Sequence, residues 1–181
     1  SSSFIVDIGS NDGILLKPLK SMGIKSLGVD PSINVGKIAN DKGLETLIGF
    51  FNNNSVEKII SNYGKPDTVV ASSIFTHIEN PKQFALDIKK LIQENGFLIL
   101  EVEYLSNFIK NIQFERFYFD RPFYYSLLSI KILFQQVGMS LVNVEHIDIH
   151  GGSIRCYIKN SKDEKSTSLV EDILKKEKLH L

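Results

Sequence analysis

Short apolar runs recur along the first hundred residues and are separated by amphipathic segments. Runs that are mostly apolar or β-branched predict strands at residues 4–8, 26–30, 44–48, 67–72 and 97–103. Helices are expected between these strands, among them 33–41, 56–63 and 81–93. Strands that alternate with helices in this way indicate a parallel sheet covered on both faces and joined by right-handed crossovers.

The pattern changes after residue 103. Residues 104–123 are rich in Phe and Tyr with charged residues between them, which is typical either of a lid over a pocket or of core packing under a loop. A helix is expected at 126–137, and strands at 140–149 and 154–158 form a hairpin. The predicted fold class is α/β, with a mostly parallel seven-stranded sheet that has an antiparallel edge strand.

The last twenty residues are strongly charged. Leu169, Ile173 and Leu174 form an apolar stripe, which indicates a helix that leads toward another domain. We therefore divide the chain into a main domain at 1–160 and a charged helical tail at 161–181. Because the sequence begins with three serines rather than with Met, we expect it to be part of a longer protein.

Composition restricts the kinds of partner. The 181 residues are 43% hydrophobic and carry 21 basic and 21 acidic side chains, so no net charge attracts nucleic acid or an anionic membrane. No apolar run approaches the ~18 residues of a membrane span. Cys156 is the only cysteine, which excludes an internal disulfide and a cysteine-rich metal site and fits a reducing compartment, the cytoplasm. We expect a small-molecule partner and no metal.

The stretch at residues 4–16 predicts a ligand-binding turn. Gly9 and Gly13 follow a buried strand and allow both a sharp turn and the close approach of a ligand. Asp30 ends the next strand, at about the spacing at which an acidic residue holds a ribose. Ligands of such sheets bind beyond the carboxyl ends of the strands, so this turn and the loops after the later parallel strands should surround one cleft.

Two residues of the turn discriminate between cofactors. The dinucleotide fingerprint needs a second glycine where this chain has Asn11, and Asp12 would repel a pyrophosphate. The turn therefore favours a nucleoside without phosphates. S-adenosylmethionine meets this condition, because its sulfonium and amino groups can face carboxylates. NAD bound by an oxidoreductase remains the alternative.

Five motifs follow one another in a fixed order along nearly the whole chain. They are Asp7-Ile-Gly-Ser-Asn-Asp-Gly13, Gly49-Phe-Phe51, Thr76-His-Ile78, Tyr118 and His150-Gly-Gly-Ser153. Together they resemble the sugar C-methyltransferases that act on nucleotide-linked keto-deoxysugars in deoxysugar biosynthesis. The resemblance implies a Rossmann-like class I methyltransferase sandwich with S-adenosylmethionine as cofactor. It also implies a central catalytic domain, flanked in the longer protein by a zinc-binding segment and a C-terminal domain.

The resemblance implies a role for each matched residue. Asp7, Gly9, Ser10, Asn11 and Gly13 would shape the cofactor pocket, Asp30 would hold the ribose, Phe51 would flank the adenine, and Ser72 and Ser73 would line the approach to the sulfonium. His77 is the candidate base for removing a proton beside the ketone, because the ordinary pKa of histidine lies near neutral. Tyr118 would donate to the enolate oxygen or share the proton transfer. His150 and Ser153 would contact the substrate.

One position departs from the family pattern. Where Tyr-x-Glu-His is common, this chain has Tyr118-Phe-Asp-Arg121. Asp120 keeps a carboxylate of catalytic interest on a shorter arm, whereas Arg121 cannot be a neutral base near pH 7 and is expected to bind a phosphate or carboxylate of the substrate. The sequence thus predicts a cytoplasmic methyltransferase for a nucleotide-linked sugar. It leaves open another small-molecule acceptor, a non-catalytic fragment that needs its missing domains, and the oligomeric state.

Overall fold

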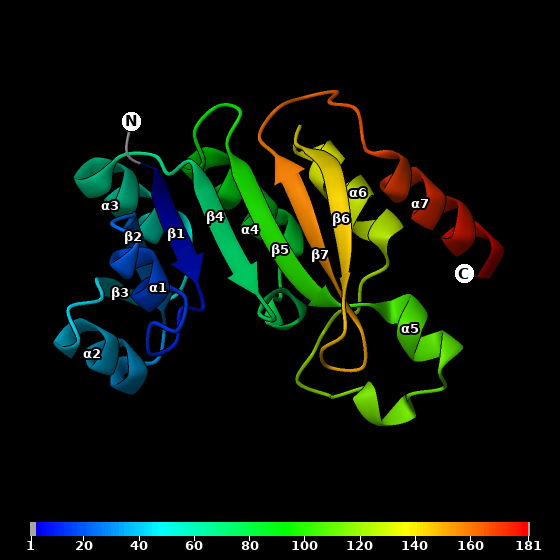
Figure 1. Ribbon diagram of the computed structural model, residues 1–181, viewed down its shortest axis with the longest axis horizontal. Helices are drawn as coiled ribbons and strands as arrows, with labels where there is room; N and C mark the ends of the chain where they lie inside the picture. The colour runs from blue at the N-terminus through cyan, green and yellow to red at the C-terminus, as the bar shows by residue number, and fades with distance from the viewer. Residues whose placement is uncertain (1–2, 181) are drawn as a thin grey trace.

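A computed structural model describes residues 3–180 of the chain, which form one sheet with helices packed against it (Figure 1). The first half contains β1 (Phe4–Ile8), α1 (Leu16–Ser21), β2 (Lys25–Asp30), α2 (Ile33–Asp41), β3 (Thr46–Ile48), α3 (Asn53–Tyr63), β4 (Thr68–Ser72) and the 3₁₀ turn η1 (Phe75–His77). The second half contains α4 (Pro81–Leu91), β5 (Phe97–Glu103), α5 (Leu105–Lys110), the 3₁₀ turn η2 (Phe114–Arg116), α6 (Leu127–Gln136), β6 (Ser140–Ile147), β7 (Ser153–Lys159) and α7 (Ser168–His180).

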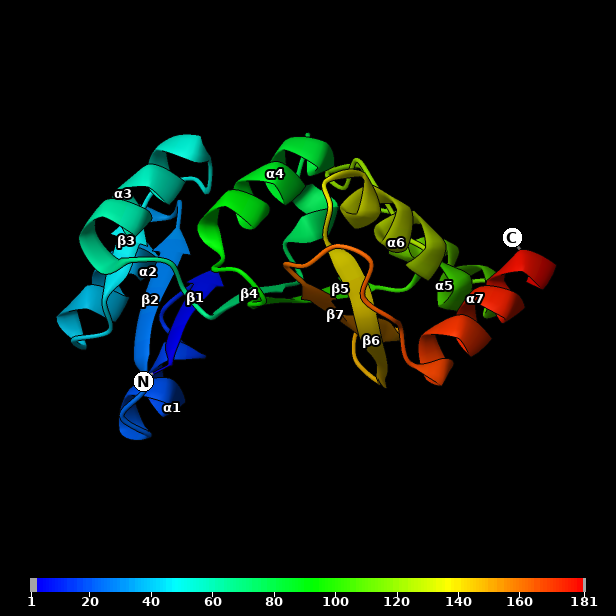
Figure 2. The same cartoon turned by 90° about the horizontal axis from the view of Figure 1, so that it is seen from above.

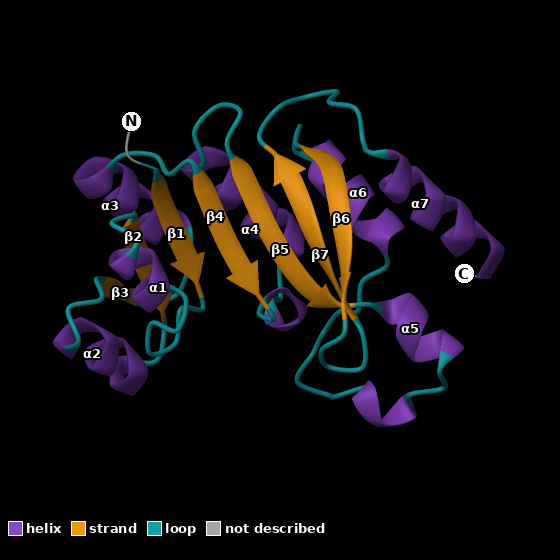
Figure 3. Cartoon of the chain, in the orientation of Figure 1, coloured by secondary structure: helices purple, strands orange, loops and turns teal. Residues whose placement is uncertain are grey.

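The sheet has seven strands in the order β3-β2-β1-β4-β5-β7-β6 (Figure 3). The first five strands along the chain pair in parallel, and β7 runs antiparallel to both of its neighbours. The predicted α/β fold class is therefore confirmed. In detail, the antiparallel strand β7 lies one place inside the edge, because the β6–β7 hairpin inserts its second strand beside β5.

Helices cover both faces of this sheet. Figure 2 shows α3, α4 and α6 along one face and α1 on the opposite face. The central strands are apolar on both sides, and residues such as Val6, Val69 and Leu98 are fully buried. This two-sided burial explains why these strands appear in the sequence as continuous apolar runs rather than as alternating ones.

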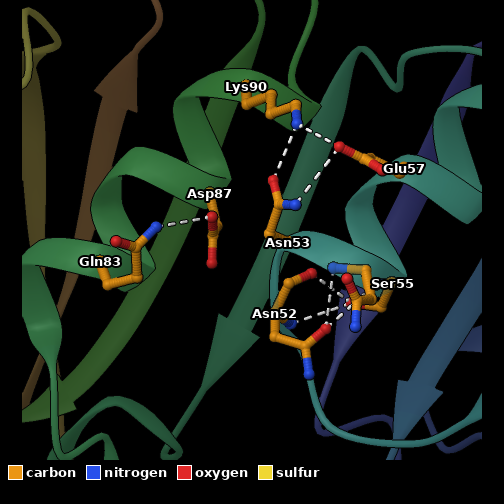
Figure 4. Close-up of polar contacts among 8 residues, drawn as sticks. Asn52, Asn53, Ser55, Glu57, Gln83, Asp87 and Lys90 are labelled. Carbon is orange, nitrogen blue, oxygen red and sulfur yellow. Dashed lines mark hydrogen bonds and ion pairs between the residues drawn. The ribbon is translucent and has the colours of Figure 1, made fainter.

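The helix α3 begins three residues before the predicted start at Val56, because Asn52 caps it (Figure 4). The Asn52 side chain accepts hydrogen bonds from the backbone N–H groups of Asn54 and Ser55, at 3.0 and 3.1 Å, and the Ser55 hydroxyl accepts one from the backbone N–H of Asn52. This reciprocal capping box fixes the entry to the helix. The same figure shows the Lys90 ammonium of α4 reaching Glu57 of α3, at 2.9 Å.

Two other predicted boundaries move for local reasons, and one predicted irregular segment contains helices. The helix α4 ends at Leu91, because Ile92 already has an extended backbone. The strand β3 begins at Thr46, because Leu44 is buried beside Leu16 and Ala39 instead of pairing in the sheet. The predicted aromatic stretch contains two short helices, α5 and η2, that the sequence pattern did not indicate.

The helix expected in the charged tail is present as α7, and it packs against α6 and β6. Val170, Ile173 and Leu174 belong to the main hydrophobic core, whereas Leu169, which the predicted stripe included, is exposed. The buried stripe therefore begins one residue later than expected. The division at residue 160 and the further domain stay predictions. In the part of the chain that is described, residues 3–180, no helix is long and apolar enough to cross a membrane.

Candidate active site

The turn after β1 is built around backbone positions that only glycine fills easily. Gly9 and Gly13 have φ angles of +76° and +87°. A Cβ atom on Gly13 would lie 2.5 Å from the buried Leu44 side chain. Gly28 of β2 has no left-handed angle, yet a Cβ there would lie 2.4 Å from the Ser10 hydroxyl, so this glycine lets the turn pack directly on β2.

Asp30 connects the end of β2 to the turn. Its Oδ2 accepts a hydrogen bond from the backbone N–H of Asn11, at 2.8 Å, and its Oδ1 accepts one from the backbone N–H of Ser32, at 2.9 Å. Asp30 as a whole is 7% exposed. Each carboxylate oxygen can accept a further hydrogen bond, so Asp30 retains acceptor capacity for hydroxyl groups of a ligand.

Asp7 of β1 and Ser10 of the turn that follows it are both buried polar residues. Burial, together with the nearby negative charge of Asp30, raises the pKa of Asp7 to about 7. The Ser10 hydroxyl is buried and has no hydrogen-bond partner within the described chain. A ligand that carries positive charge and polar groups would relieve both conditions, which fits the sulfonium and amino group of S-adenosylmethionine.

The predicted aromatic wall of the pocket is anchored from behind. Phe51 is half-buried, directly precedes the Asn52 cap of α3, and contacts Phe84 edge-on with ring centroids 5.3 Å apart. Its position is therefore fixed by the core. Phe50, in contrast, is largely exposed.

The loop after β4 carries the next group of predicted residues. Ser72 and Ser73 are exposed at the end of the strand, and Ser73 has a φ angle of +58°. His77 ends the 3₁₀ turn η1 and is also exposed. The turn is held by Phe75, which is fully buried and stacks on Tyr125 with ring centroids 4.5 Å apart.

The aromatic residues after β5 reach this loop. We name residues 105–126, which contain α5 and η2, the lid segment. Asp120 of the lid segment lies 3.9 Å from Nδ1 of His77. The guanidinium of Arg121 lies 4.7 Å from the centre of the Tyr118 ring and pairs with the buried carboxylate of Glu103. The structure thus pairs His77 with Asp120 and Tyr118 with Arg121.

The turn between β6 and β7 also packs against the lid segment. A Cβ on Gly152 would lie 1.9 Å from the Asn107 amide, so the glycine permits this contact. The Gly152 N–H donates to Ile149, at 2.9 Å, and the buried Ser153 hydroxyl also donates to Ile149. These two polar groups are therefore used within the turn itself. His150 is exposed and has a φ angle of +52°.

The sequence comparison agrees with this geometry. A family described as "Methyltransferase domain" matches residues 1–144. The chain belongs to the methyltransferase domain family. The predicted enzyme class, a methyltransferase, is confirmed, and S-adenosylmethionine stays the predicted methyl donor. The alternative, an oxidoreductase that binds NAD, belongs to another enzyme class and is not supported.

Curated relatives include C-methyltransferase NovU of Streptomyces niveus, which is 34% identical over 150 residues that make up 83% of this chain and 36% of NovU. The mitochondrial ubiquinone biosynthesis O-methyltransferase of Arabidopsis thaliana is 28% identical over 98 residues, 52% of this chain and 30% of that protein. The chain thus spans about a third of the length of these relatives.

Solved structures show the same fold. A SAM-dependent methyltransferase from Archaeoglobus fulgidus superposes with a TM-score of 0.70 at 16% identity, over 88% of this chain and 86% of that chain. The magnesium protoporphyrin IX methyltransferase from Synechocystis with bound SAH gives a TM-score of 0.66 at 18% identity, over 88% and 75% of the two chains. The Rossmann-like methyltransferase sandwich is therefore confirmed.

The sequence left the role of Glu103 open between facing the site and forming a cap or salt bridge, and it assigned no role to Gly28. Glu103 could be placed at the end of β5 but not against Arg121, because the partner lies 18 residues away in an irregular segment. Gly28 gave no motif signal, since its importance comes only from the closeness of Ser10. Among the described residues, no group of three or more His, Cys, Asp or Glu side chains is arranged to hold a metal.

Proposed function

We propose that this domain methylates a carbon atom of a nucleotide-linked keto-deoxysugar. The observation that carries the proposal is the approach of Asp120 to His77, at 3.9 Å, beside the end of β4. A carboxylate beside Nδ1 leaves Nε2 of the imidazole to act as a base, and it stabilises the charged ring after proton transfer. The name of NovU, a C-methyltransferase, supports the same reaction type.

The reaction begins with removal of a proton from the carbon beside the ketone. Nε2 of His77 takes this proton, and the C–H electron pair moves to give the enolate. The Tyr118 hydroxyl donates a hydrogen bond to the enolate oxygen and lowers the cost of its negative charge. When bound, S-adenosylmethionine would supply an electrophilic methyl group to the enolate carbon, with the S–C bond breaking as the C–C bond forms and S-adenosylhomocysteine as the leaving group. Asp120 holds the imidazolium until its proton passes to solvent.

The cofactor side of the site is assigned to the turn and its neighbours. We place the methionine end against Gly9, Ser10, Asn11 and Gly13, with the carboxylate of Asp7 near the positive charge. Asp30 binds the ribose hydroxyls, Phe51 flanks the adenine, and Ser72 and Ser73 line the path to the methyl group. The buried Ser10 hydroxyl without a partner supports this assignment.

We call the part of the site that binds the methyl-accepting substrate the acceptor side, and we assign it to Arg121, His150 and Ser153. Glu103 already pairs with Arg121, but a guanidinium has five N–H donors, so some remain for a phosphate or carboxylate of the acceptor. Ser153 is buried, and its hydroxyl already donates its hydrogen to the carbonyl of Ile149. Toward the methyl-accepting substrate this hydroxyl can therefore act only as a hydrogen-bond acceptor. The cytoplasm is the compartment that we propose.

The decisive experiment uses S-adenosylmethionine labelled with ¹³C in its methyl group and a panel of nucleoside-diphosphate-linked keto-deoxysugars. The proposal expects a new C–CH₃ signal in the NMR spectrum, and exchange of the sugar proton beside the ketone with deuterium from solvent. A His77→Ala variant should lose both signals and keep S-adenosylhomocysteine binding. An O–CH₃ signal would instead establish O-methylation, the reaction named for the ubiquinone biosynthesis relatives.

Repeating the assay on the longer protein distinguishes two cases: a domain that needs its flanking segments for activity, and a domain that lacks the activity. Turnover that appears only with the flanking segments identifies this chain as a dependent part. Absence of the C–CH₃ product and of proton exchange in both forms overturns the proposal.

A further inference from the structure

Glu177 of α7 is buried at the base of the lid segment. Its Oε1 accepts hydrogen bonds from the Tyr104 hydroxyl and from the backbone N–H of Leu127, both at 2.7 Å. Its Oε2 accepts one from the backbone N–H of Leu128, at 2.9 Å. Tyr104 is the residue directly before the lid segment, and Leu127 is the residue directly after it. One carboxylate therefore holds both ends of the lid segment.

The position of this carboxylate is well defined. Glu177 is 4% exposed, and a buried carboxylate is tolerated only when donors replace its lost water. Two of its three donors are the first N–H groups of α6, where the helix dipole also favours negative charge. Ile173 and Leu174, one turn earlier in α7, are part of the main core and fix the helix that carries Glu177.

Beyond this base, fewer contacts hold the lid segment. Ile112, Phe114 and Phe119 of the lid segment are largely exposed. A cavity of about 460 Å³ separates α5 from α7, with Lys110 on one wall and Lys176 on the other. Segments with little buried apolar surface open more easily than the core. Inside the lid segment, Phe108 is buried and contacts Phe117 and Tyr124. The lid segment is held to the rest of the chain by the contacts at its base, the Arg121–Glu103 ion pair and the packing of Asn107 on Gly152.

The base of the lid segment also touches the element that carries His77. Tyr125 pairs with Tyr104 in an isolated bridge, and its carbonyl accepts a hydrogen bond from the N–H of Leu105, at 3.1 Å. The Tyr125 ring stacks on Phe75 of η1, two residues before His77. A movement of Tyr104 and Tyr125 at the base of the lid segment would therefore move both η1 and the lid segment.

We propose that Glu177 is a positioning residue for the acceptor side of the site. By tying Tyr104 and the start of α6 to α7, it closes the base of the lid segment and keeps Asp120 beside His77. The effect on methyl transfer rests on the function proposed above, whereas the effect on the lid segment does not.

The test compares the Glu177→Gln variant with the parent protein, in the full chain. Glutamine keeps the shape but offers one acceptor oxygen, and its NH₂ group opposes a backbone N–H. We expect amide hydrogen exchange of residues 105–126 to quicken about tenfold, with β1–β4 unchanged and S-adenosylhomocysteine affinity within about twofold of the parent. Acceptor kcat/KM should fall about tenfold. Glu171→Gln is the matched control, because Glu171 lies on the same helix, is exposed and pairs with Lys131 at 3.1 Å; it should change none of these values.

Tyr104→Phe is the second variant and removes only one of the three donors. It should quicken exchange in the lid segment about threefold, and it serves if Glu177→Gln does not fold. Unchanged exchange in residues 105–126, or a uniform increase over α7, β6 and the lid segment, overturns the positioning role. If amide exchange quickens only in the lid segment but the protein methylates no keto-sugar, Glu177 still positions the lid segment and the proposed methyl acceptor is wrong.

Discussion

The carboxylate of Asp30 accepts a hydrogen bond from the backbone N–H of Asn11, 2.8 Å away, and so fastens the end of β2 to the turn after β1. Asn11 has a φ angle of +52°, a conformation that asparagine tolerates better than most residues. The residue expected to hold the ribose thus also holds the turn that receives the rest of the cofactor. A substitution there changes two things at once, and a test must measure both.

Asp30→Asn should weaken S-adenosylhomocysteine binding by about tenfold or more, because ribose hydroxyls lose a charged acceptor. The free energy of unfolding should fall by about 1 kcal/mol, since the amide cannot accept from both Asn11 and Ser32 as well as a carboxylate does. Calorimetry and urea unfolding separate the two effects. Asp41→Asn, at the exposed end of α2, is the control and should be neutral. Unchanged affinity in Asp30→Asn would exclude the ribose role.

Binding of the positively charged cofactor should depend on the ionisation of Asp7, whose pKa is raised to about 7. The ionised carboxylate attracts a cation, and the protonated one does not. We therefore expect S-adenosylmethionine affinity to fall as the pH drops from 8 to 6, by up to about tenfold per pH unit below 7. In Asp7→Asn the affinity should be low and nearly independent of pH. A parent protein whose affinity is flat between pH 6 and 8 would contradict this role.

The same group should make the cofactor-free domain less stable in alkaline solution. Because the pKa of Asp7 is raised on folding, the folded state holds its proton more tightly than the unfolded state does. Its contribution is fully present below the unfolded pKa of about 4 and is lost as the pH rises through about 7. The free energy of unfolding of Asp7→Asn should therefore be about 2 kcal/mol higher than that of the parent at pH 8, and nearly equal to it at pH 4. Equal stability of the two proteins at both pH values would argue against a buried, shifted carboxyl.

Gly28→Ala should disturb the cofactor turn from behind. The new methyl would lie within 3 Å of Ser10 and of Leu16, both of which are buried. We expect a loss of about 2 kcal/mol in the free energy of unfolding, and weaker S-adenosylhomocysteine binding. Ser26→Ala, two residues earlier in the same strand, is the control and should cost less than about 0.5 kcal/mol. If the two variants have the same free energy of unfolding, the close packing of Ser10 on β2 does not contribute to stability.

The parallel half of the fold and the cofactor side of the site are predictable from the sequence. Their signals are local, because a buried strand, a turn with Gly9 and Gly13 and an acid such as Asp30 follow one another within thirty residues. The boundaries that moved depended on single contacts. One example is Asn52, whose cap begins α3 three residues before the apolar pattern does.

The acceptor side could be predicted only as a list of candidate residues. Its geometry depends on pairs far apart in the chain, such as His77 with Asp120 and Tyr104 with Glu177. The sequence shows that Arg121 carries a charge, but not that Glu103 already meets that charge. The use of Glu177 had no local signal either, because a glutamate on a charged helix usually faces solvent.

The Arg121–Glu103 ion pair gives a last test, by a double-mutant cycle. Glu103 is buried, so Arg121→Met leaves a carboxylate with no cation beside it and should lower the free energy of unfolding by about 3 kcal/mol. Adding Glu103→Gln removes the uncompensated charge, and most of the loss should then be recovered, with a coupling energy of about 2 kcal/mol. The exposed pair Lys131–Glu171 is the matched control, and its cycle should give less than about 1 kcal/mol. Additive losses at Arg121 and Glu103 would mean that the lid segment is held mainly at its base, which leaves Glu177 and Tyr104 as the contacts that place Asp120 beside His77.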